Sequence, residues 1–508
     1  MNLVQESWIP VVKTDGKKAE ANLRDIFLSG AGYADLAIRP HERVALMRLL
    51  ICIAQAALKG PENLDHWKKA PELLPKKADE YLTKWPDSFN LFHPVKPFLQ
   101  ITELKHSKQA PVSTLDFAMS SGNNTTLFDH QGNDAEARPL PEDQLALNLL
   151  TFQNFSSQGG ASIVQWKGVR TSQVGNPAAP CSKGSIYHAF LKGANLAETI
   201  HLNLLTKKTV ELVFGDDGWG KPVWELMPSG PNDGPAIANA TQTYLGRLVP
   251  LSRWIKLQNQ SGMIWGNGFA YSVFPDFRCP EPSATSIEWK DRQGRPIRNL
   301  LKASHARGIW RQLPALIVKR RAGEVGGALA LENVPDDKGL DIHVCALLRK
   351  QATIEAYEES VFHVPAGMNT DIGRAAYEEE VRIAETKARR LGWAVEKWRR
   401  EMDADWEQKV KAAKKKNALL ERLRSIATNH FWTAVEKNVP VLLAYTSSFG
   451  ENDNEERKKI WRRAVHRKAR EAYELACGRE SPRQLRAFAM GLRVLEREEI
   501  PETENQEE

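Results

Sequence analysis

The sequence predicts an α+β fold, with a large irregular mixed N-terminal domain followed by a C-terminal four-helix bundle. The chain has 508 residues, more than a single hydrophobic core usually serves. Residues 1–366 mix apolar helical stretches with short β-like runs and many Gly and Pro breaks, whereas long helical patterns dominate residues 367–500. Residues 501–508 form an acidic tail that we expect to be disordered. Because strands and helices do not alternate regularly, a continuous parallel sheet is not expected.

Several elements of the N-terminal domain follow from its apolar patterns. The strongly apolar stretch Arg43–Leu58 predicts a long helix, and Leu145–Phe152 predicts another. Val210–Phe214 and Ser272–Phe274 are interpreted as short strands. Leu196–Leu205 fits either a strand or a helix.

The C-terminal domain is predicted from long helices with short connections. Asp371–Met402 is one helix, and a second candidate runs from Trp406 to about Leu443 with a break near Lys437–Pro440. The third covers Asn454–Cys477, with acidic residues in its first turn where the helix dipole favours them. Ser481-Pro482 opens the fourth, with Ser as N-cap and Pro at the first helical position. Four such helices predict an antiparallel bundle.

Composition excludes several classes of protein. Hydrophobic residues make up 42% and charged residues 26%, as in ordinary globular proteins. The sequence lacks an apolar run long enough for a membrane span and begins without the basic and apolar regions of a signal peptide, so a cytoplasmic location is expected. The five cysteines form no Cys-x-x-Cys pair, which argues against a disulfide framework and a local zinc site. We expect no cofactor.

Positive charge is concentrated in the C-terminal helices. The net charge is +7, and residues 381–430 alone carry fourteen Lys and Arg against seven Asp and Glu. Arg457–Arg470 has eight basic residues and no acidic one. Such clustering is typical of proteins with a polyanionic partner, although a solvated helix face has the same pattern. Nucleic-acid contact is therefore assigned to Arg462, Arg463 and Arg467 as a hypothesis.

The common catalytic motifs are missing from the sequence. It contains no phosphate-binding Gly-x-x-x-x-Gly-Lys-Ser/Thr, no His-Glu-x-x-His and no Gly-x-Ser-x-Gly. Asp129-His130 is a conceivable fragment of a nuclease site but has no accompanying metal-ligand pattern. We therefore expect a protein that is not an enzyme and has no catalytic residues.

The order of three short segments identifies a family resemblance. Ser120–His130 is a polar loop carrying one aromatic, Phe128; Gln158–Ala161 is rich in glycine; and Arg349–Ala352 follows an apolar run. Together with the N-terminal Asn2-Leu3 and Trp8–Val11, and with His93-Pro94 followed by Pro97–Gln100, the chain resembles CasA, the large subunit of the type I-E Cascade complex. The resemblance covers nearly the whole chain and rests on order and spacing.

The resemblance implies an RNA-guided DNA surveillance function. Family members bind a guide-RNA-loaded assembly of other Cascade subunits, recognise the protospacer-adjacent motif in double-stranded DNA, and separate the strands so that the guide can pair. The complex then recruits a separate helicase-nuclease. The implied partners are thus DNA, guide RNA and proteins, with no membrane.

The resemblance also assigns site residues. In relatives, a glycine-rich loop presents its backbone to the DNA minor groove, and the resemblance assigns this role chiefly to Gly160. Gln351 and Ala352 match a wedge that begins strand separation, with Lys350 where the family has a polar amide. Phe128 matches an aromatic near the 5′ end of the guide RNA. The nucleic-acid-binding residues predicted outside the C-terminal helices are Phe128, Gly159, Gly160, Ala161, Asn267, Lys290, Lys350, Gln351 and Ala352.

One departure concerns the lysine that relatives insert into the minor groove. The aligned stretch Met263–Phe269 contains no lysine, and Asn267 is proposed in its place. Lys290 resembles a family lysine that touches the duplex backbone. The motif preferred by this chain is therefore expected to differ from that of relatives with the lysine.

Two further functions remain open from sequence. The first is a nuclease or other nucleic-acid enzyme with a catalytic site that no motif marks. The second is a protein-only scaffold whose basic helices are solvated. Metal-dependent DNA cleavage would favour the first, and salt-independent subunit association without DNA binding would favour the second.

Overall fold

The fold divides into two compact units. The computed structural model describes residues 1–106, 108–117, 138–158, 162–171, 178–182, 184–272, 281–291, 293–320, 325–350, 353–403, 418–448 and 453–497. The first unit comprises Met1–Pro335 and Leu340–His363, and the second comprises Asp336–Gly339 and Val364–Glu508. None of the helices in these described ranges combines the length and apolarity needed to span a bilayer.

The first unit is organised around a long buried helix, α2 (Pro40–Leu58), which contains the predicted helix Arg43–Leu58. Pro40 occupies its first turn, and Glu42 accepts a hydrogen bond from the Arg39 backbone amide. Fifteen of its nineteen residues are buried, so the helix has no polar face and lies inside the unit. It packs against α3 (Leu64–Lys84), α4 (Glu142–Phe155) and strand β12.

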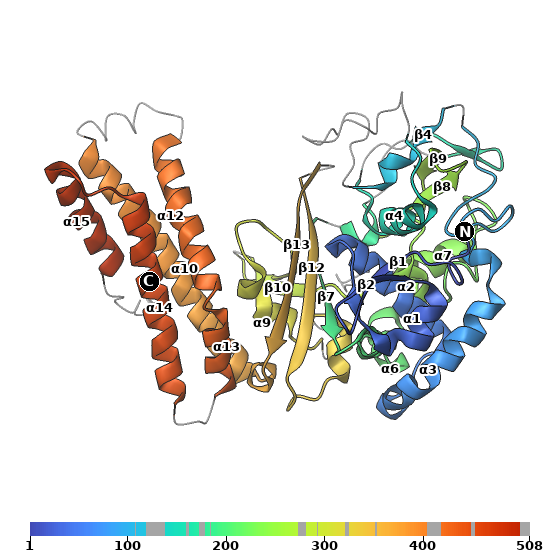
Figure 1. The fold of residues 1–508 in the computed structure, drawn as a ribbon, viewed down its shortest axis with the longest axis horizontal. Coiled ribbons are helices and arrows are strands. Elements are labelled where there is room, and N and C mark those ends of the chain that lie inside the picture. Colours follow the sequence, from blue (N-terminus) through green and yellow to red (C-terminus); the bar gives the residue numbers. More distant parts are fainter. Residues whose placement is uncertain are drawn as a thin grey trace. The chain divides into compact units, whose positions relative to one another are not determined.

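Two three-stranded sheets carry predicted site residues, Lys350 in one and Asn267 in the other. One has the order β13-β12-β7, with β7 (Tyr187–Lys192), β12 (Leu340–Lys350) and β13 (Thr353–Val364); the two long strands β12 and β13 run beside each other in Figure 1. Strand β12 pairs antiparallel with β7 from Asp341↔Lys192 to Ala346↔Tyr187. The other has the order β4-β9-β8, with β4 (Ala110–Pro111), β8 (Arg253–Leu257) and β9 (Gly262–Asn267).

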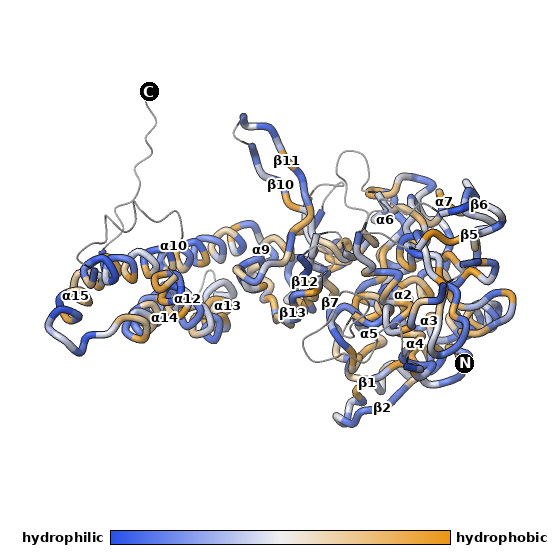
Figure 2. The backbone as a smooth tube through the Cα atoms, turned by 90° about the horizontal axis from the view of Figure 1, so that it is seen from above, coloured by the Kyte–Doolittle hydropathy of each residue, from blue (hydrophilic) through white to orange (hydrophobic). Residues whose placement is uncertain are grey.

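The described part of the first unit has three further sheets, one of three strands and two of two strands. The N-terminal sheet has the order β2-β1-β3. A hairpin of β10 and β11 extends away from the rest of this unit (Figure 2). The remaining strands are β1 (Ile9–Lys13), β2 (Lys18–Ala21), β3 (Tyr33–Leu36), β5 (Gln165–Trp166), β6 (Val169–Arg170), β10 (Ser286–Lys290) and β11 (Pro296–Leu300).

Several short helices also belong to this unit. They are α1 (Leu23–Ser29), α5 (Leu196–Leu202), α6 (Lys207–Phe214), α7 (Gly234–Gln242), α8 (Tyr244–Leu248) and α9 (Leu313–Leu316).

One predicted strand was wrong and one ambiguity is resolved. Val210–Phe214 lies in helix α6, because Thr206 caps the helix through the amide of Thr209 and Val210 and Val213 share its buried face. Leu196–Leu205 is helical over Leu196–Leu202, capped by Asn195. Ser272 belongs to no strand, and residues 273 and 274 lie outside the described ranges.

The second unit is the C-terminal helical bundle. It contains α10 (Asp371–Met402), α12 (Ala418–Glu436), α13 (Val439–Ser447), α14 (Asn454–Ala476) and α15 (Pro482–Glu496), and α10 packs against each of the others. The long helices lie side by side in Figure 1. Thr370 caps α10, and Ser481 caps α15 in a capping box with Gln484. The predicted bundle is thus present, with α13 as an additional short helix before α14.

Candidate nucleic-acid interface

The segment leading to the glycine loop is anchored to a buried arginine. Arg253 in β8 is 2% exposed, and its Nη2 donates to the main-chain carbonyl of Ser157 at 2.5 Å. Gln153 near the end of α4 accepts from the Arg253 amide and donates to the Arg253 carbonyl, both at 2.9 Å. These bonds fix the direction in which the chain leaves α4 toward Gly159, Gly160 and Ala161.

The segment leading to the wedge begins at the end of β12. The backbone amide of Arg349 donates to the hydroxyl of Ser185 at 2.9 Å, and Lys350 is exposed at the strand end. The Arg349 guanidinium lies 4.7 Å from the ring centroid of Phe117. Burial lowers the pKa of Arg349 to about 10, and the positive charge of Arg253 acts in the same direction. Arg349 therefore remains a cation at neutral pH, within electrostatic range of Arg253.

Phe117 is held in place by its neighbours on α2 and α4. Asp116 accepts from Arg39 Nη1 at 2.8 Å and from Gln144 Nε2 at 3.3 Å. The Phe117 ring stacks on Phe152 with centroids 5.8 Å apart. Phe117 thus offers a fixed aromatic face to Arg349.

His41 completes this group as a neutral ring. It is 1% exposed and stacks on Tyr357 with centroids 4.6 Å apart. Burial holds the pKa of His41 well below its usual range, and the charges of Arg39 and Arg349 lower it further. Since the imidazole is uncharged at neutral pH, it does not compete with Arg349 for an anion.

Asn267 is badly placed for direct contact with DNA. It lies opposite Arg253 in the β8–β9 pair and is 4% exposed. The backbone beside it is equally enclosed, because a Cβ at Gly268 would lie 2.4 Å from the carbonyl oxygen of Leu251. The expectation that Asn267 replaces a groove-reading lysine therefore conflicts with its burial, and we leave it out of the interface.

Lys290, in contrast, lies on an accessible surface. It is the last residue of β10, exposed and opposite Pro296 in β11. Beside it, Trp289 is 44% exposed and pairs with Ile297, which is 37% exposed. The hairpin thus presents an exposed aromatic next to a lysine.

The three arginines predicted on α14 fall into two classes. Arg462 donates to both carboxylate oxygens of Glu380, which is 1% exposed, at distances of 2.6–3.0 Å. Arg463 and Arg467 have side chains 72% and 67% exposed, with their nearest carboxylates at 3.5 and 3.8 Å. Arg462 therefore neutralises a buried acid within the bundle, whereas Arg463 and Arg467 face outward.

Several predicted residues lie outside the described ranges. These are Phe128, Gly159, Gly160, Ala161, Gln351 and Ala352, together with Asp129 and His130. Their roles stay predictions, although the residues leading to two of the segments are placed. No motif marked Arg253, Phe117 or His41, because their significance comes from tertiary contacts. Of the residues around the interface, the sequence indicated only Arg349, because it lies directly before the predicted wedge.

Comparison with known proteins decides the family. The model of the CRISPR-associated protein Cse1 family matches residues 2–472. The chain belongs to the CRISPR-associated Cse1 family. A curated relative, CRISPR-associated protein CasA/Cse1 of Thermus thermophilus, is 27% identical over 96% of this chain and 95% of its own.

Solved Cse1 structures share the fold. Thermobifida fusca Cse1 superposes with a TM-score of 0.77 at 20% identity, covering 97% of this chain and 98% of that one. A chain of a structure described as a CRISPR RNA-guided surveillance complex superposes with a TM-score of 0.70 at 18% identity, covering 97% and 99%. At these identities the likeness concerns the α+β architecture and its helical C-terminal region.

A cluster with metal-ligand chemistry lies elsewhere in the Cse1 fold. Ligand atoms of His343, Cys345 and Glu359 lie within 4.8 Å of one another. Glu359, however, accepts from His343 Nε2 at 2.6 Å and from Arg43 Nε at 3.0 Å. Burial raises the pKa of the Cys345 thiol, which disfavours the thiolate that binds metals. The group is better explained as an ion-pair network joining α2 to the β12–β13 hairpin.

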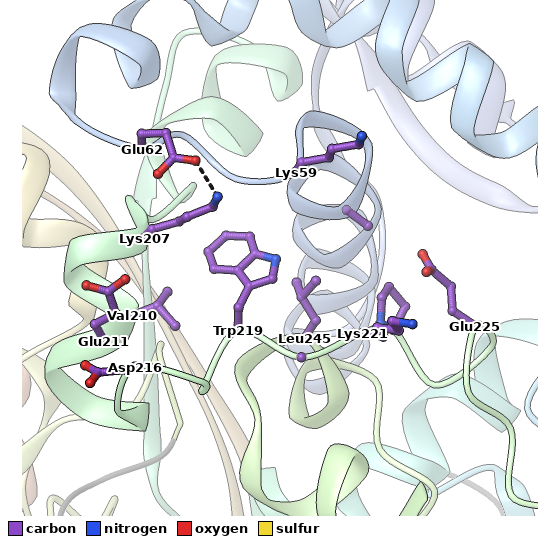
Figure 3. Close-up of a pocket in the computed structure, with 13 residues that line it drawn as sticks. Lys59, Glu62, Lys207, Val210, Glu211, Asp216, Trp219, Lys221, Glu225 and Leu245 are labelled. Atoms are coloured by element: carbon purple, nitrogen blue, oxygen red, sulfur yellow. Dashed lines mark hydrogen bonds and ion pairs between the residues drawn. The ribbon is translucent and has the colours of Figure 1, made fainter. Parts of the chain in front are cut away.

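A surface pocket of about 600 Å³ lies at the C-terminal end of α2. Figure 3 shows Trp219 in its centre, with Lys59 above and the Glu62–Lys207 ion pair at one side. Three lysines and four acidic residues line it, and it includes none of the predicted nucleic-acid-binding residues. Its mixed charge favours no particular ligand.

Proposed function

We propose that this Cse1 family member is the non-catalytic DNA-recognition subunit of an RNA-guided CRISPR surveillance complex. It recognises the protospacer-adjacent motif in duplex DNA, promotes strand opening and R-loop formation, and helps recruit a separate helicase-nuclease for antiviral defence. The observation that carries the proposal is the match of the Cse1 family model to residues 2–472. Two arginines, Arg253 and Arg349, support the segments assigned to motif recognition and strand opening. One anchors the entry to the glycine loop, and the other lies directly before the wedge segment.

These two segments match the two steps of the proposed reaction. A glycine-rich loop has no side chains to hold its backbone away from a groove, so Gly159 and Gly160 suit close approach to the motif. The wedge then acts at the adjoining base step, where unstacking costs about 0.6–2.2 kcal/mol. Pairing with the guide RNA offsets that free energy at later base steps. Gln351 and Ala352 therefore need to stabilise only the first opened base step.

The β10–β11 hairpin supplies a second contact to duplex DNA. A two-stranded ribbon has the dimensions of a DNA groove, and Lys290 at its exposed end can contact a phosphate. The hairpin also carries Arg298, paired with Glu288 at 2.6 Å across the strands. That ion pair stiffens the ribbon, and a second pair, Arg295 with Asp291 at 2.9 Å, lies at the turn beyond Lys290.

The exposed face of α14 supplies contacts that do not depend on sequence. Arg463 and Arg467 lie one helical turn apart and extend into solvent. Their charges suit the backbone of a displaced single strand, which is bound electrostatically. Arg462 contributes through the stability of the bundle instead.

Reconstitution tests the proposal. The chain is purified with its neighbouring subunits, and we expect guide RNA and the small backbone subunits to accompany it. The assembled complex should bind motif-bearing duplex more tightly than duplex with a scrambled motif. A chain that associates with subunits but gives no motif-dependent binding would contradict the proposal. Mg²⁺- or Mn²⁺-dependent cleavage by the purified chain, abolished by Asp129→Ala or His130→Ala, would support a nuclease instead.

A further inference from the structure

Arg349 has a guanidinium whose hydrogen-bonding capacity is largely unused. Its Nε and Nη2 are enclosed, and neither has an acceptor within the described chain. The group is instead held by its stacking over Phe117. Leaving a buried charged donor unsatisfied is unfavourable, because the hydrogen bonds it made to water are lost and not replaced. The unsatisfied donors of Arg349 therefore destabilise the folded chain, and a bound hydrogen-bond acceptor would remove that destabilisation.

Other buried arginines of this unit are used differently. Arg48 and Arg247 both donate to Glu281, at 2.8 and 2.6 Å, and are 1% exposed or less. Arg253 donates to the carbonyls of Ser252 and Ser157. Each of these three cross-links distant segments, which is the usual structural role of a buried arginine. The enclosed Nε and Nη2 of Arg349 make no comparable hydrogen bond to the described residues.

The surroundings of Arg349 favour an incoming anion. The nearby carboxylates Asp116 and Glu42 both accept from Arg39, at 2.8 Å from its Nη1 and Nε respectively. Arg253 adds positive charge, and Lys350 extends it to the surface. Among the described residues, positive charge therefore prevails at the end of β12.

We propose that Arg349, stacked on Phe117, binds a phosphodiester of the nucleic acid beside the opened base step. A planar guanidinium can donate two parallel hydrogen bonds to phosphate oxygens, and an aromatic face holds it in that orientation. Arg349 precedes the predicted wedge residue Gln351 by two positions, which places the phosphate next to the point of strand separation. This inference rests on the proposed function. The phosphodiester belongs either to a DNA strand or to the guide RNA, which share this chemistry.

The proposal makes an unusual prediction for the free chain. Arg349→Gln removes a charge whose enclosed donors have no acceptor among the described residues, so the isolated chain should unfold at the same temperature as wild type or higher. A structural arginine would instead destabilise the chain on removal. Arg349→Lys, which keeps the charge without the planar donor pair, should give an intermediate loss of nucleic-acid binding.

The decisive experiment combines Arg349→Gln with neutral backbone substitutions. Single methylphosphonates, which remove one phosphate charge, are placed at successive positions of either DNA strand around the motif in complexes of wild type and variant. With wild type, one position should lower DNA affinity by about tenfold to a hundredfold, the range for losing a charged hydrogen bond. With Arg349→Gln, that position should have no further effect. Arg24→Gln, which breaks a surface pair with Asp79, is the matched charge control and should retain the wild-type response.

The guide RNA is tested in parallel by measuring the RNA content of each purified complex. Loss of RNA with Arg349→Gln, but not with Arg24→Gln, would assign the phosphodiester to the guide. Equal sensitivity of wild type and Arg349→Gln at every DNA position, together with unchanged RNA content, would overturn the phosphate site. Motif-dependent binding by wild type would still stand in that case, so failure of this inference is distinct from failure of the proposed function.

Discussion

Arg253, buried on the edge strand β8 of the β4–β9–β8 sheet, donates to the carbonyl of Ser157, immediately before the glycine-rich segment. The bond connects a rigid strand to a loop with few side chains of its own. Burial lowers the pKa of Arg253 to about 10, so the arginine keeps its charge at neutral pH while donating to main-chain carbonyls. Under the proposed function, recognition by the loop therefore depends on a buried residue that supports its entry.

Replacing this anchor should impair both stability and recognition. Arg253→Met leaves the Ser157 and Ser252 carbonyls without their donor, which should lower the free energy of unfolding by about 1–3 kcal/mol. Motif-dependent DNA binding should weaken as well, because the loop entry loses its fixed direction. Chemical denaturation and DNA titration measure the two effects. Full motif discrimination in a folded Arg253→Met variant would show that the anchor is dispensable.

A bulky side chain in the glycine loop should impair DNA binding without affecting the fold. Gly160→Leu should weaken binding to motif-bearing duplex and leave complex assembly and thermal unfolding unchanged, because the side chain would separate the backbone from the groove. Gly32→Leu is a useful control, since a Cβ at Gly32 meets no atom within 4 Å. Normal target binding by Gly160→Leu would reduce the loop to an ordinary turn.

The arginines of α14 should separate into structural and electrostatic roles. Charge reversal at Arg463 and Arg467 should weaken binding to all DNA sequences alike and reduce the salt slope by about one for each phosphate that is no longer neutralised. The bundle should keep its stability. Arg462→Glu should instead destabilise the bundle by roughly 1–3 kcal/mol, because it leaves the buried Glu380 without its donor. Salt-dependent binding assays paired with thermal unfolding test this; an unchanged salt slope for the Arg463 and Arg467 reversal would mean that neither contacts phosphate.

The ion-pair network on α2 predicts a loss of stability in acid. Burial alone would raise the pKa of Asp35, but Arg43 and Lys192 hold it below its ordinary value. A hydrogen bond from His343 lowers the pKa of Glu359, and the charge of Arg43 lowers it further. Since both folded pKa values lie below the unfolded ones, this stability is present above about pH 4 and is lost as the pH falls through the folded values.

Arg43→Met should reveal that contribution. Without Arg43 the two carboxyl groups lose a shared cation, so the variant should have a lower unfolding temperature at pH 7 and a smaller further decrease on acidification than wild type. Thermal unfolding between pH 3 and pH 7 measures both, with Arg24→Gln as the surface control. Parallel curves for wild type and Arg43→Met would exclude the network as a source of acid sensitivity.

Local sequence signals predicted the helices well and the site only in part. Asp371–Met402 is reproduced without change, because a long charged pattern follows Thr370, which caps the helix. Val210–Phe214 was mistaken for a strand because its β-branched and aromatic residues favour one, whereas the Thr206 cap and the tertiary packing of Val210 favour a helix. Short apolar runs are ambiguous for this reason.

The site depends on contacts between residues far apart in the chain. Arg253 and Ser157 are joined across two elements, and Arg349 and Phe117 are separated by most of the first unit. No spacing in a single sequence encodes such pairs. Nor does the charge pattern predict the structural role of Arg462, because its partner Glu380 lies on another helix of the bundle, α10. Sequence order indicated the segments that we propose for recognition, and only the fold identified the residues that support them.

The central claim is that the residues after Lys350 open the duplex, and R-loop formation on matched DNA targets tests it most directly. Gln351→Ala, or glycine at both Gln351 and Ala352, is compared with wild type on closed duplex and on a target with mismatched bases beside the motif. We expect slow R-loop formation on the closed duplex and a nearly normal rate on the pre-opened one, because unstacking is already supplied there. An equal defect on both targets, or none on either, would contradict the claim.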